Sequence, residues 1–119
     1  MIYTVTLNPA IDKTAYIPGF CAGSVNRVQS VREDAGGKGI NVSKCLKALG
    51  TESVAAVILA GETGKYLKTL LKQEDLEILP VQTAGQTRTN LKIVDKESGK
   101  NTDINEPGPV VDEKYHIAL

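Results

Sequence analysis

The chain has 119 residues, a length that suits one domain with a modest core. Its 14 basic and 14 acidic side chains cancel, so no general electrostatic field attracts a nucleic acid or an anionic membrane. No stretch approaches the roughly 20 apolar residues that span a bilayer, and a signal peptide is not evident, so we expect a cytoplasmic protein. Cys21 and Cys45 are too few for a metal site or a disulfide framework, and we expect two reduced thiols.

The first part of the chain is rich in β-forming residues. Residues 2–7 predict a strand that ends at Asn8-Pro9, because proline cannot continue regular pairing. Two further β-prone runs follow at residues 14–17 and 26–31, with turn signals at Pro18-Gly19 and Gly23-Ser24 between them. These runs predict a small antiparallel excursion after the first strand.

An amphipathic helix is predicted over residues 39–49. Apolar side chains recur there at i, i+3, i+4 and i+7, at Val42, Cys45, Leu46 and Leu49. Gly50 stands where a left-handed C-terminal cap is expected. We expect Cys45 to pack in the core as part of this stripe rather than to carry chemistry.

A βαβα order emerges from the next two segments. The continuous apolar run at residues 54–59 has the length of a buried parallel strand. A second helix is then predicted, with an apolar face formed by Tyr66, Leu67, Leu70 and Leu71.

A β-hairpin is predicted near the end of the chain. Residues 88–94 alternate in polarity, and the turn at Ser98-Gly99-Lys100 would fold residues 102–104 back against them. The period of two puts Arg88, Asn90 and Lys92 on one face, which is therefore polar and basic. For Lys92 we favour a solvated side chain.

A glycine cluster directly precedes the predicted helix. Gly36, Gly37 and Gly39 allow backbone conformations and a close ligand approach that larger residues resist, and Lys38 adds a positive charge at a helix N-terminus. This arrangement predicts an anion site. The cluster is neither a Walker A loop, since Gly39 follows the lysine, nor a dinucleotide fingerprint, since Val42 occupies the third glycine position. A tight strand-to-helix turn with a solvated lysine is the structural alternative.

Three motifs, in this order and spacing, resemble the phosphofructokinase-B branch of the ribokinase-like sugar kinases: Asn8-Pro9-Ala10-Ile11-Asp12, Ala35-Gly36-Gly37-Lys38-Gly39-Ile40-Asn41-Val42 and Thr87-Arg88-Thr89-Asn90-Leu91. The opening residues 1–9, the Gly37-Lys38-Gly39 form of the cluster and Asn105-Glu106-Pro107-Gly108-Pro109 are typical of the bacterial 1-phosphofructokinases and tagatose-6-phosphate kinases in that branch. The resemblance runs from residue 1 to about residue 113.

The resemblance implies an α/β, ribokinase-like fold: the N-terminal part of a Rossmann-like αβα sandwich with an inserted β-sheet lid. Residues 1–119 would be the N-terminal portion of the kinase domain, with lid strands at approximately 13–34 and 88–106. Family members are much longer, and we expect their C-terminal nucleotide-binding half, with the catalytic base, to be absent here. The lone His116 is expected to be an ordinary surface or terminal residue, and whether residues 116–119 are native sequence stays open.

The same resemblance implies an ATP-dependent phosphotransferase that, as the full-length parent, converts fructose 1-phosphate to fructose 1,6-bisphosphate with ATP and Mg²⁺. A tagatose-6-phosphate kinase is the nearest alternative. A non-catalytic sugar-phosphate-binding or dimerisation module is a further one. The parent would be a homodimer through its β lid, with a small sugar phosphate as its partner and neither nucleic acid nor membrane.

Candidate residues follow for the hydroxyl groups of the sugar. A carboxylate accepts hydrogen bonds from two adjacent hydroxyls, which assigns Asp12 to substrate orientation, with an Asx-turn as the alternative. Gly37 and Asn41 would add backbone and amide hydrogen bonds, although Asn41 could instead cap the helix. The resemblance implies that Asn90 also lies at the sugar phosphate.

The phosphate dianion requires positive charge. Lys38 and Arg88 are the main candidates, since lysine supplies a point charge and arginine a bidentate fork. Arg27 is the weakest candidate, because a charged residue in a lid strand is usually solvated. We assign no catalytic base and no metal ligand within this sequence.

Overall fold

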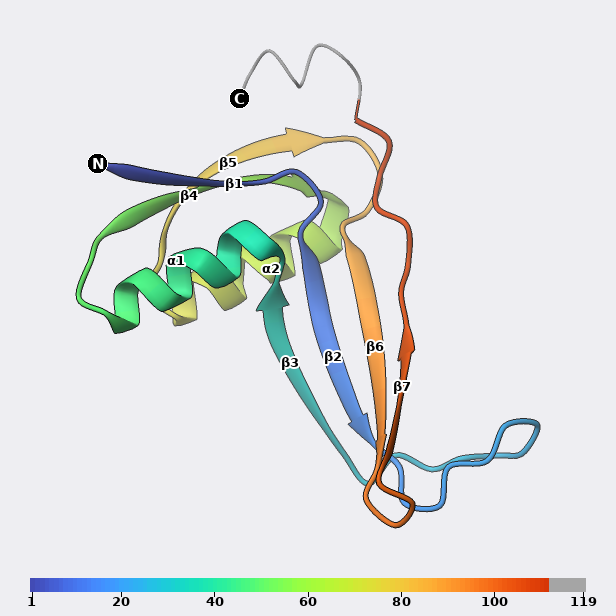
Figure 1. The fold of residues 1–119 in the computed structure, drawn as a ribbon. Helices are drawn as coiled ribbons and strands as arrows, with labels where there is room; N and C mark the ends of the chain where they lie inside the picture. The colour runs from blue at the N-terminus through green and yellow to red at the C-terminus, as the bar shows by residue number, and fades with distance from the viewer. Residues whose placement is uncertain (112–119) are drawn as a thin grey trace.

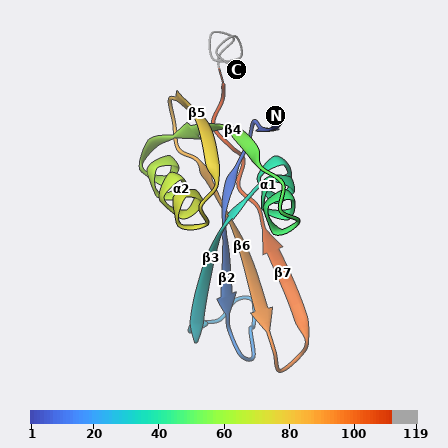
Figure 2. The same cartoon turned by 90° about the vertical axis from the view of Figure 1, so that its left-hand side faces the viewer.

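The computed structural model describes residues 1–111, which form two β-sheets and two helices. The main sheet is parallel and has the order β1-β4-β5, built from β1 (Ile2–Thr6), β4 (Ser53–Ala60) and β5 (Glu77–Thr83). Helices α1 (Lys38–Ala48) and α2 (Gly61–Gln73) connect these strands and lie on the same side of the sheet (Figures 1 and 2). The arrangement confirms the predicted βαβα order and fold class.

The second sheet has the order β3-β2-β6-β7 and extends away from the main sheet (Figure 1). It consists of β2 (Ala10–Tyr16), β3 (Ser30–Gly36), β6 (Arg88–Asp95) and β7 (Lys100–Ile104). β2 is antiparallel to β3 and parallel to β6, and β6 forms the predicted hairpin with β7. The chain enters this sheet directly after β1 and leaves it into α1, so the base of the sheet adjoins the end of β1.

One core joins the helices to both sheets. Ala55, Val57 and Leu59 alternate along β4 and face the helices, where they meet Ile40 of α1 and Leu67 of α2. Ile11 and Ala35, at the base of the second sheet, belong to the same buried cluster. The second sheet is therefore anchored to the helical layer at one end only.

The predicted apolar face of α1 is wrong. Val42, Cys45 and Leu49 are exposed, and the buried positions are Ile40 and Ser43. Ser43 lies against the main sheet, where its hydroxyl is within hydrogen-bond distance of Thr4 Oγ1 (2.7 Å). A periodic apolar stripe does not reveal which face of a helix meets the sheet. Cys45, expected in the core, is an exposed free thiol, as is Cys21.

The end of α1 follows the prediction closely. Gly50 has φ +81°, and the N–H groups of Gly50 and Thr51 donate to the carbonyls of Lys47 and Leu46. This pair of bonds is a Schellman cap, which requires the left-handed conformation that glycine adopts readily.

β5 was not predicted from the sequence. It contains Pro80 opposite Val57 of β4, and proline within an apolar run weakens a strand prediction because it is confined to edge strands. Among the described residues β5 is an edge strand, which explains why the proline is tolerated. The predicted runs at 14–17 and 26–31 only overlap β2 and β3, since β2 ends at Tyr16 and residues 26–29 are not strand. Both strands instead reach to Ala10 and Gly36, because pairing continues through polar residues such as Asp12 and Asp34.

No helix within residues 1–111 is long and apolar enough to cross a bilayer. His116 lies outside the described residues.

Candidate functional site

The glycine cluster joins the end of β3 to the start of α1 beside β1. Gly37 precedes the helix with φ +132°, a conformation that side chains resist. A Cβ on Gly39 would collide with Thr6 Oγ1 and come within 2.7 Å of the Val5 carbonyl oxygen. The Ile40 N–H donates to Thr6 Oγ1 at 3.0 Å, so a side chain of β1 accepts a hydrogen bond from one of the backbone donors at the helix N-terminus. Close packing thus accounts for Gly39, and it places the N-terminus of α1 at the carboxyl end of β1.

Gly36 makes room for the Asp12 side chain. A Cβ on Gly36 would overlap the carboxylate of Asp12, which lies in β2 rather than in an Asx-turn. Asp12 is opposite Asp34 on β3 and Asn90 on β6 in the sheet register. These three residues form a polar row across the second sheet, near its base.

A second row of polar residues follows further from the helices. Thr14 is opposite Arg32 and Lys92, and Lys92 is opposite Asp103 of β7. Alternation along each strand puts both rows on one face of the sheet. That face is therefore polar over four strands, as the period-two pattern of residues 88–94 predicted for β6 alone.

A cavity of about 670 Å³ lies against this polar face and extends to the helices. Of the residues predicted to bind substrate, Asp12, Asn41 and Asn90 line it. Asn41 lies in the first turn of α1 and makes no side-chain cap. Of the predicted residues, the cavity thus brings together one carboxylate and two amides, which are suited to hydrogen bonds with hydroxyl groups.

The electrostatics of the cavity centre on Asp12. Burial raises the pKa of the Asp12 carboxyl above its usual value, and the positive charges of Lys44 and Arg88 oppose that increase. The Asn90 amide also lowers the pKa of Asp12, whereas the neighbouring Asp34 raises it. Asp34 is itself paired with Arg32 at 2.8 Å in an exposed ion pair.

Lys38, Gly37 and Arg88 border the site but do not line the cavity. Lys38 is exposed at the first residue of α1. Arg88 stands one row closer to the helices than Asp12, opposite Ala10, and its Nη2 donates to the Asn8 carbonyl at 3.1 Å. Arg88 Nε is buried and has no hydrogen-bond partner among the described residues.

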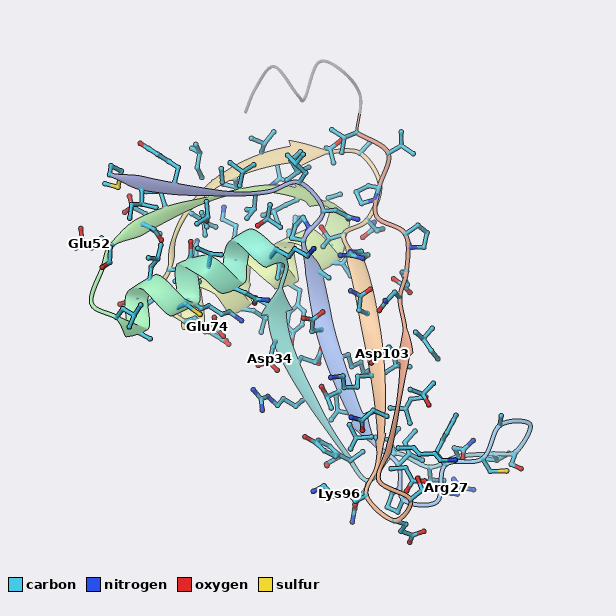
Figure 3. All side chains as sticks on the ribbon, in the orientation of Figure 1. Arg27, Asp34, Glu52, Glu74, Lys96 and Asp103 are labelled. Carbon is cyan, nitrogen blue, oxygen red and sulfur yellow. The ribbon has the colours of Figure 1, made fainter. Side chains whose placement is uncertain are left out.

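Arg27 is not brought to the site. It is exposed and lies at the end of the second sheet farthest from the helices (Figure 3). Figure 3 also shows Asp34 and Asp103 along the strands between that end and the helices. Lys92, for which we favoured a solvated side chain, is exposed and also lines the cavity.

Several residues that line the cavity were not predicted from the sequence. They are Lys13, Thr14, Arg32, Asp34, Lys44, Glu74, Asp103 and Asn105. Asp34 is placed by strand register and Glu74 by the packing of α2, which no local pattern encodes. Lys44 could have been found, since it follows Asn41 by three residues and therefore shares its helix face.

Within residues 1–111, no three His, Cys, Asp or Glu side chains gather in a way that could hold a metal ion. The carboxylates of the cavity, Asp12, Asp34, Glu74 and Asp103, are interspersed with amide and basic groups. The lining therefore offers both hydrogen-bonding and charged groups of either sign.

Comparison with known proteins identifies a family of carbohydrate kinases. The sequence pattern of the family described as "pfkB family carbohydrate kinase" matches residues 5–118. The chain is 42% identical over 120 residues to a 1-phosphofructokinase from Bacillus subtilis. That alignment covers 100% of this chain and 39% of the relative. It is also 44% identical over 105 residues to a 1-phosphofructokinase from Xanthomonas campestris, and that alignment covers 88% of this chain and 33% of the relative.

A solved structure shares the fold. The phosphofructokinase-2 of Escherichia coli, in complex with fructose-6-phosphate, superposes with a TM-score of 0.92 and 30% identity, over 98% of this chain and 39% of that one. The chain therefore spans between a third and two fifths of the length of these relatives.

Proposed function

Since the chain belongs to the pfkB family of carbohydrate kinases, we propose that it is the sugar-binding portion of an ATP-dependent kinase that phosphorylates fructose 1-phosphate to fructose 1,6-bisphosphate. The relatives named 1-phosphofructokinase support this substrate. The activity belongs to the full-length parent, and we place it in the cytoplasm.

The observation that carries the proposal is the polar row formed by Asp34, Asp12 and Asn90, which faces a cavity beside the N-terminus of α1. A phosphorylated sugar has hydroxyls at one end and a dianion at the other. The row and Asn41 offer acceptors and amides for the hydroxyls, while the helix N-terminus and Lys38 favour the anion.

We assign roles on this basis. Asp12 orients two hydroxyls, and Gly37 and Asn41 add hydrogen bonds from backbone and amide. Lys38 and Arg88 neutralise the phosphate, with Arg88 exchanging its bond to the Asn8 carbonyl for one to the ligand. The buried, unpartnered Nε of Arg88 supports this assignment, because a buried donor without an acceptor costs free energy that a phosphate oxygen would recover. Arg27 lies at the far end of the second sheet and remains the weakest candidate for a contact with the phosphate.

The second sheet acts in this proposal as a lid over the sugar. Its strands, within residues 10–36 and 88–104, are anchored at one end, which leaves the rest free to cover the ligand. We further propose a homodimer through the opposite face of this lid. Val31 on β3 and Ile104 on β7 are about half exposed on that face, and apolar side chains in that setting favour a protein contact.

ATP and Mg²⁺ bind, in this proposal, to the part of the kinase domain that corresponds to the remaining three fifths of the relatives' length. Phosphoryl transfer depends on in-line positioning and charge stabilisation, and a bound Mg²⁺ would supply positive charge to the phosphates of ATP. The residues described here hold and orient the acceptor sugar for that step.

Binding of substrates to the full-length protein tests the proposal. In titration calorimetry, fructose 1-phosphate should bind more tightly than fructose, because only the phosphate engages Lys38 and Arg88. Tagatose 6-phosphate is titrated in parallel, and tighter binding of this sugar than of fructose 1-phosphate would favour the alternative substrate. Equal affinities for fructose and fructose 1-phosphate would show that the site does not recognise a phosphate.

A further inference from the structure

Lys44 connects three elements around the cavity, and none of the roles assigned above includes it. It lies on α1, and its Nζ donates to the Ala35 carbonyl on β3 at 2.5 Å. The same Nζ is 3.4 Å from Glu74 Oε2, just beyond the end of α2. The side chain is only 28% exposed and lines the same cavity as Asp12.

The contact with Ala35 acts on the position of Asp12. Ala35 directly precedes Gly36, whose missing side chain provides the space that the Asp12 carboxylate occupies. Holding the Ala35 carbonyl against α1 therefore fixes the strand that borders Asp12. Glu74 Oε2 is buried and accepts no hydrogen bond from the described residues, so the charge of Lys44 is its compensation there.

Charge from Lys44 also reaches Asp12. The charged groups that face this carboxylate are Lys44 on α1, Arg88 on β6 and Asp34 on β3. Of the groups that favour its ionised form, Lys44 makes the largest contribution. Burial raises the pKa of Asp12 and the charge of Lys44 lowers it, so this lysine supports the ionised carboxylate that accepts hydrogen bonds.

We propose that Lys44 is a positioning residue of the sugar site, which holds the end of β3 against α1 and keeps the Asp12 carboxylate in place as a hydrogen-bond acceptor for the hydroxyls of the substrate. This inference rests on the proposed function. It assigns Lys44 no contact with the phosphate.

The test uses the full-length protein with three variants. Lys44→Met removes the donor and the charge, Lys44→Gln keeps a donor for Ala35 but removes the charge, and Lys44→Arg keeps both. Lys47→Met is the matched control, because Lys47 also links α1 to the residues after α2, through the carbonyls of Glu74 and Asp75, but does not line this cavity.

Two quantities are measured. The first is the pKa of Asp12, followed by carbon NMR of labelled aspartate carboxyls without substrate. The second is the pH profile of kcat/KM for fructose 1-phosphate. Lys44→Met and Lys44→Gln should both shift the Asp12 pKa and the acidic limb of the profile to higher pH, and lower kcat more than they raise KM. Lys44→Arg should restore the wild-type limb, and Lys47→Met should leave it unchanged.

An Asp12 pKa in Lys44→Gln equal to that of the wild type would overturn the inference, as would an equal shift in Lys47→Met. Lys44→Gln keeps the inference testable if Lys44→Met does not fold. Because the NMR titration needs no substrate, a protein that fails to phosphorylate fructose 1-phosphate would contradict the proposed function while still showing whether Lys44 controls Asp12.

Discussion

Asp12 shows how a residue proposed to bind substrate can oppose stability. Its carboxylate is partly buried, and the charges of Lys44 and Arg88 compensate for that burial only in part, so its pKa is raised. The folded state therefore binds the proton of Asp12 more tightly than the unfolded state does. As the pH rises from below the unfolded pKa of about 3.9 through the folded pKa, ionisation of Asp12 lowers the free energy of unfolding.

Asp12→Asn should accordingly raise the melting temperature at neutral pH and lower kcat for the sugar. The amide removes the buried charge but accepts fewer hydrogen bonds from hydroxyls. The difference in melting temperature should disappear as the pH falls below the usual aspartate range, where the wild-type carboxyl is neutral in both states. Calorimetric melts of the full-length protein over a range of pH check this, and a variant less stable than the wild type at pH 7 would contradict it.

Lys38 and Arg88 should affect substrate and nucleotide differently. Replacing either with Ala removes a charge-assisted hydrogen bond worth roughly 1.5 to 3 kcal/mol, or about ten- to a hundredfold in kcat/KM for fructose 1-phosphate. The KM for ATP should stay nearly unchanged. Arg88→Ala should also lower stability, since it releases the Asn8 carbonyl, whereas Lys38 is exposed. Steady-state kinetics with each substrate varied in turn provide the measurement, and an unaltered kcat/KM in Lys38→Ala would leave this residue a solvated lysine.

At the scale of elements, local signals were sufficient for some features and not for others. Gly50 and the alternation of residues 88–94 predicted a cap and a strand face correctly, because each depends on a few neighbouring residues. The buried face of α1 depends instead on the hydroxyl of Thr4, far along the chain, and the row through Asp34 depends on strand register. The substrate-binding roles rest partly on residue chemistry and partly on the resemblance to a family, and they remain predictions.

The junction of β3 and α1 allows two glycine substitutions to be compared. Gly36→Ala places its Cβ against the carboxylate end of Asp12, a flexible side chain, so it should lower kcat/KM with little loss of stability. Gly39→Ala places its Cβ against the backbone of β1 and should lower the melting temperature, although alanine favours a helix more than glycine does. Thermal melts and kinetics on both variants test the contrast, and a Gly39→Ala protein as stable as the wild type would contradict the packing described here.

For the whole molecule, the main sheet has helices on one side only within residues 1–111 (Figure 2). On the other side Tyr3 and Val5 of β1 and Leu79 of β5 are 62%, 57% and 49% exposed. Exposed apolar area of this kind, beside a strand edge without a described partner, favours association. In the proposed full-length kinase the remainder of the domain would cover this face.

The 119-residue chain expressed alone should consequently be weakly stable or self-associating, and it should show no kinase activity. Sedimentation velocity and thermal melts measure the first property, and an ATP turnover assay measures the second. A monomer with a sharp cooperative melt would contradict the prediction that the exposed face causes instability or association. ATP-dependent turnover by the purified chain would contradict the proposal that ATP and the catalytic base lie in the remainder of the kinase domain.

Turnover of the full-length protein with ATP shows most directly whether it is a fructose-1-phosphate kinase. Fructose 1-phosphate, tagatose 6-phosphate and fructose are compared as acceptors, and the product is identified by phosphorus NMR. Fructose 1-phosphate should have the highest kcat/KM, and its product should carry the new phosphate on C6. Dominant turnover of the unphosphorylated sugar would contradict the account, because Lys38 and Arg88 would then have no phosphate to neutralise.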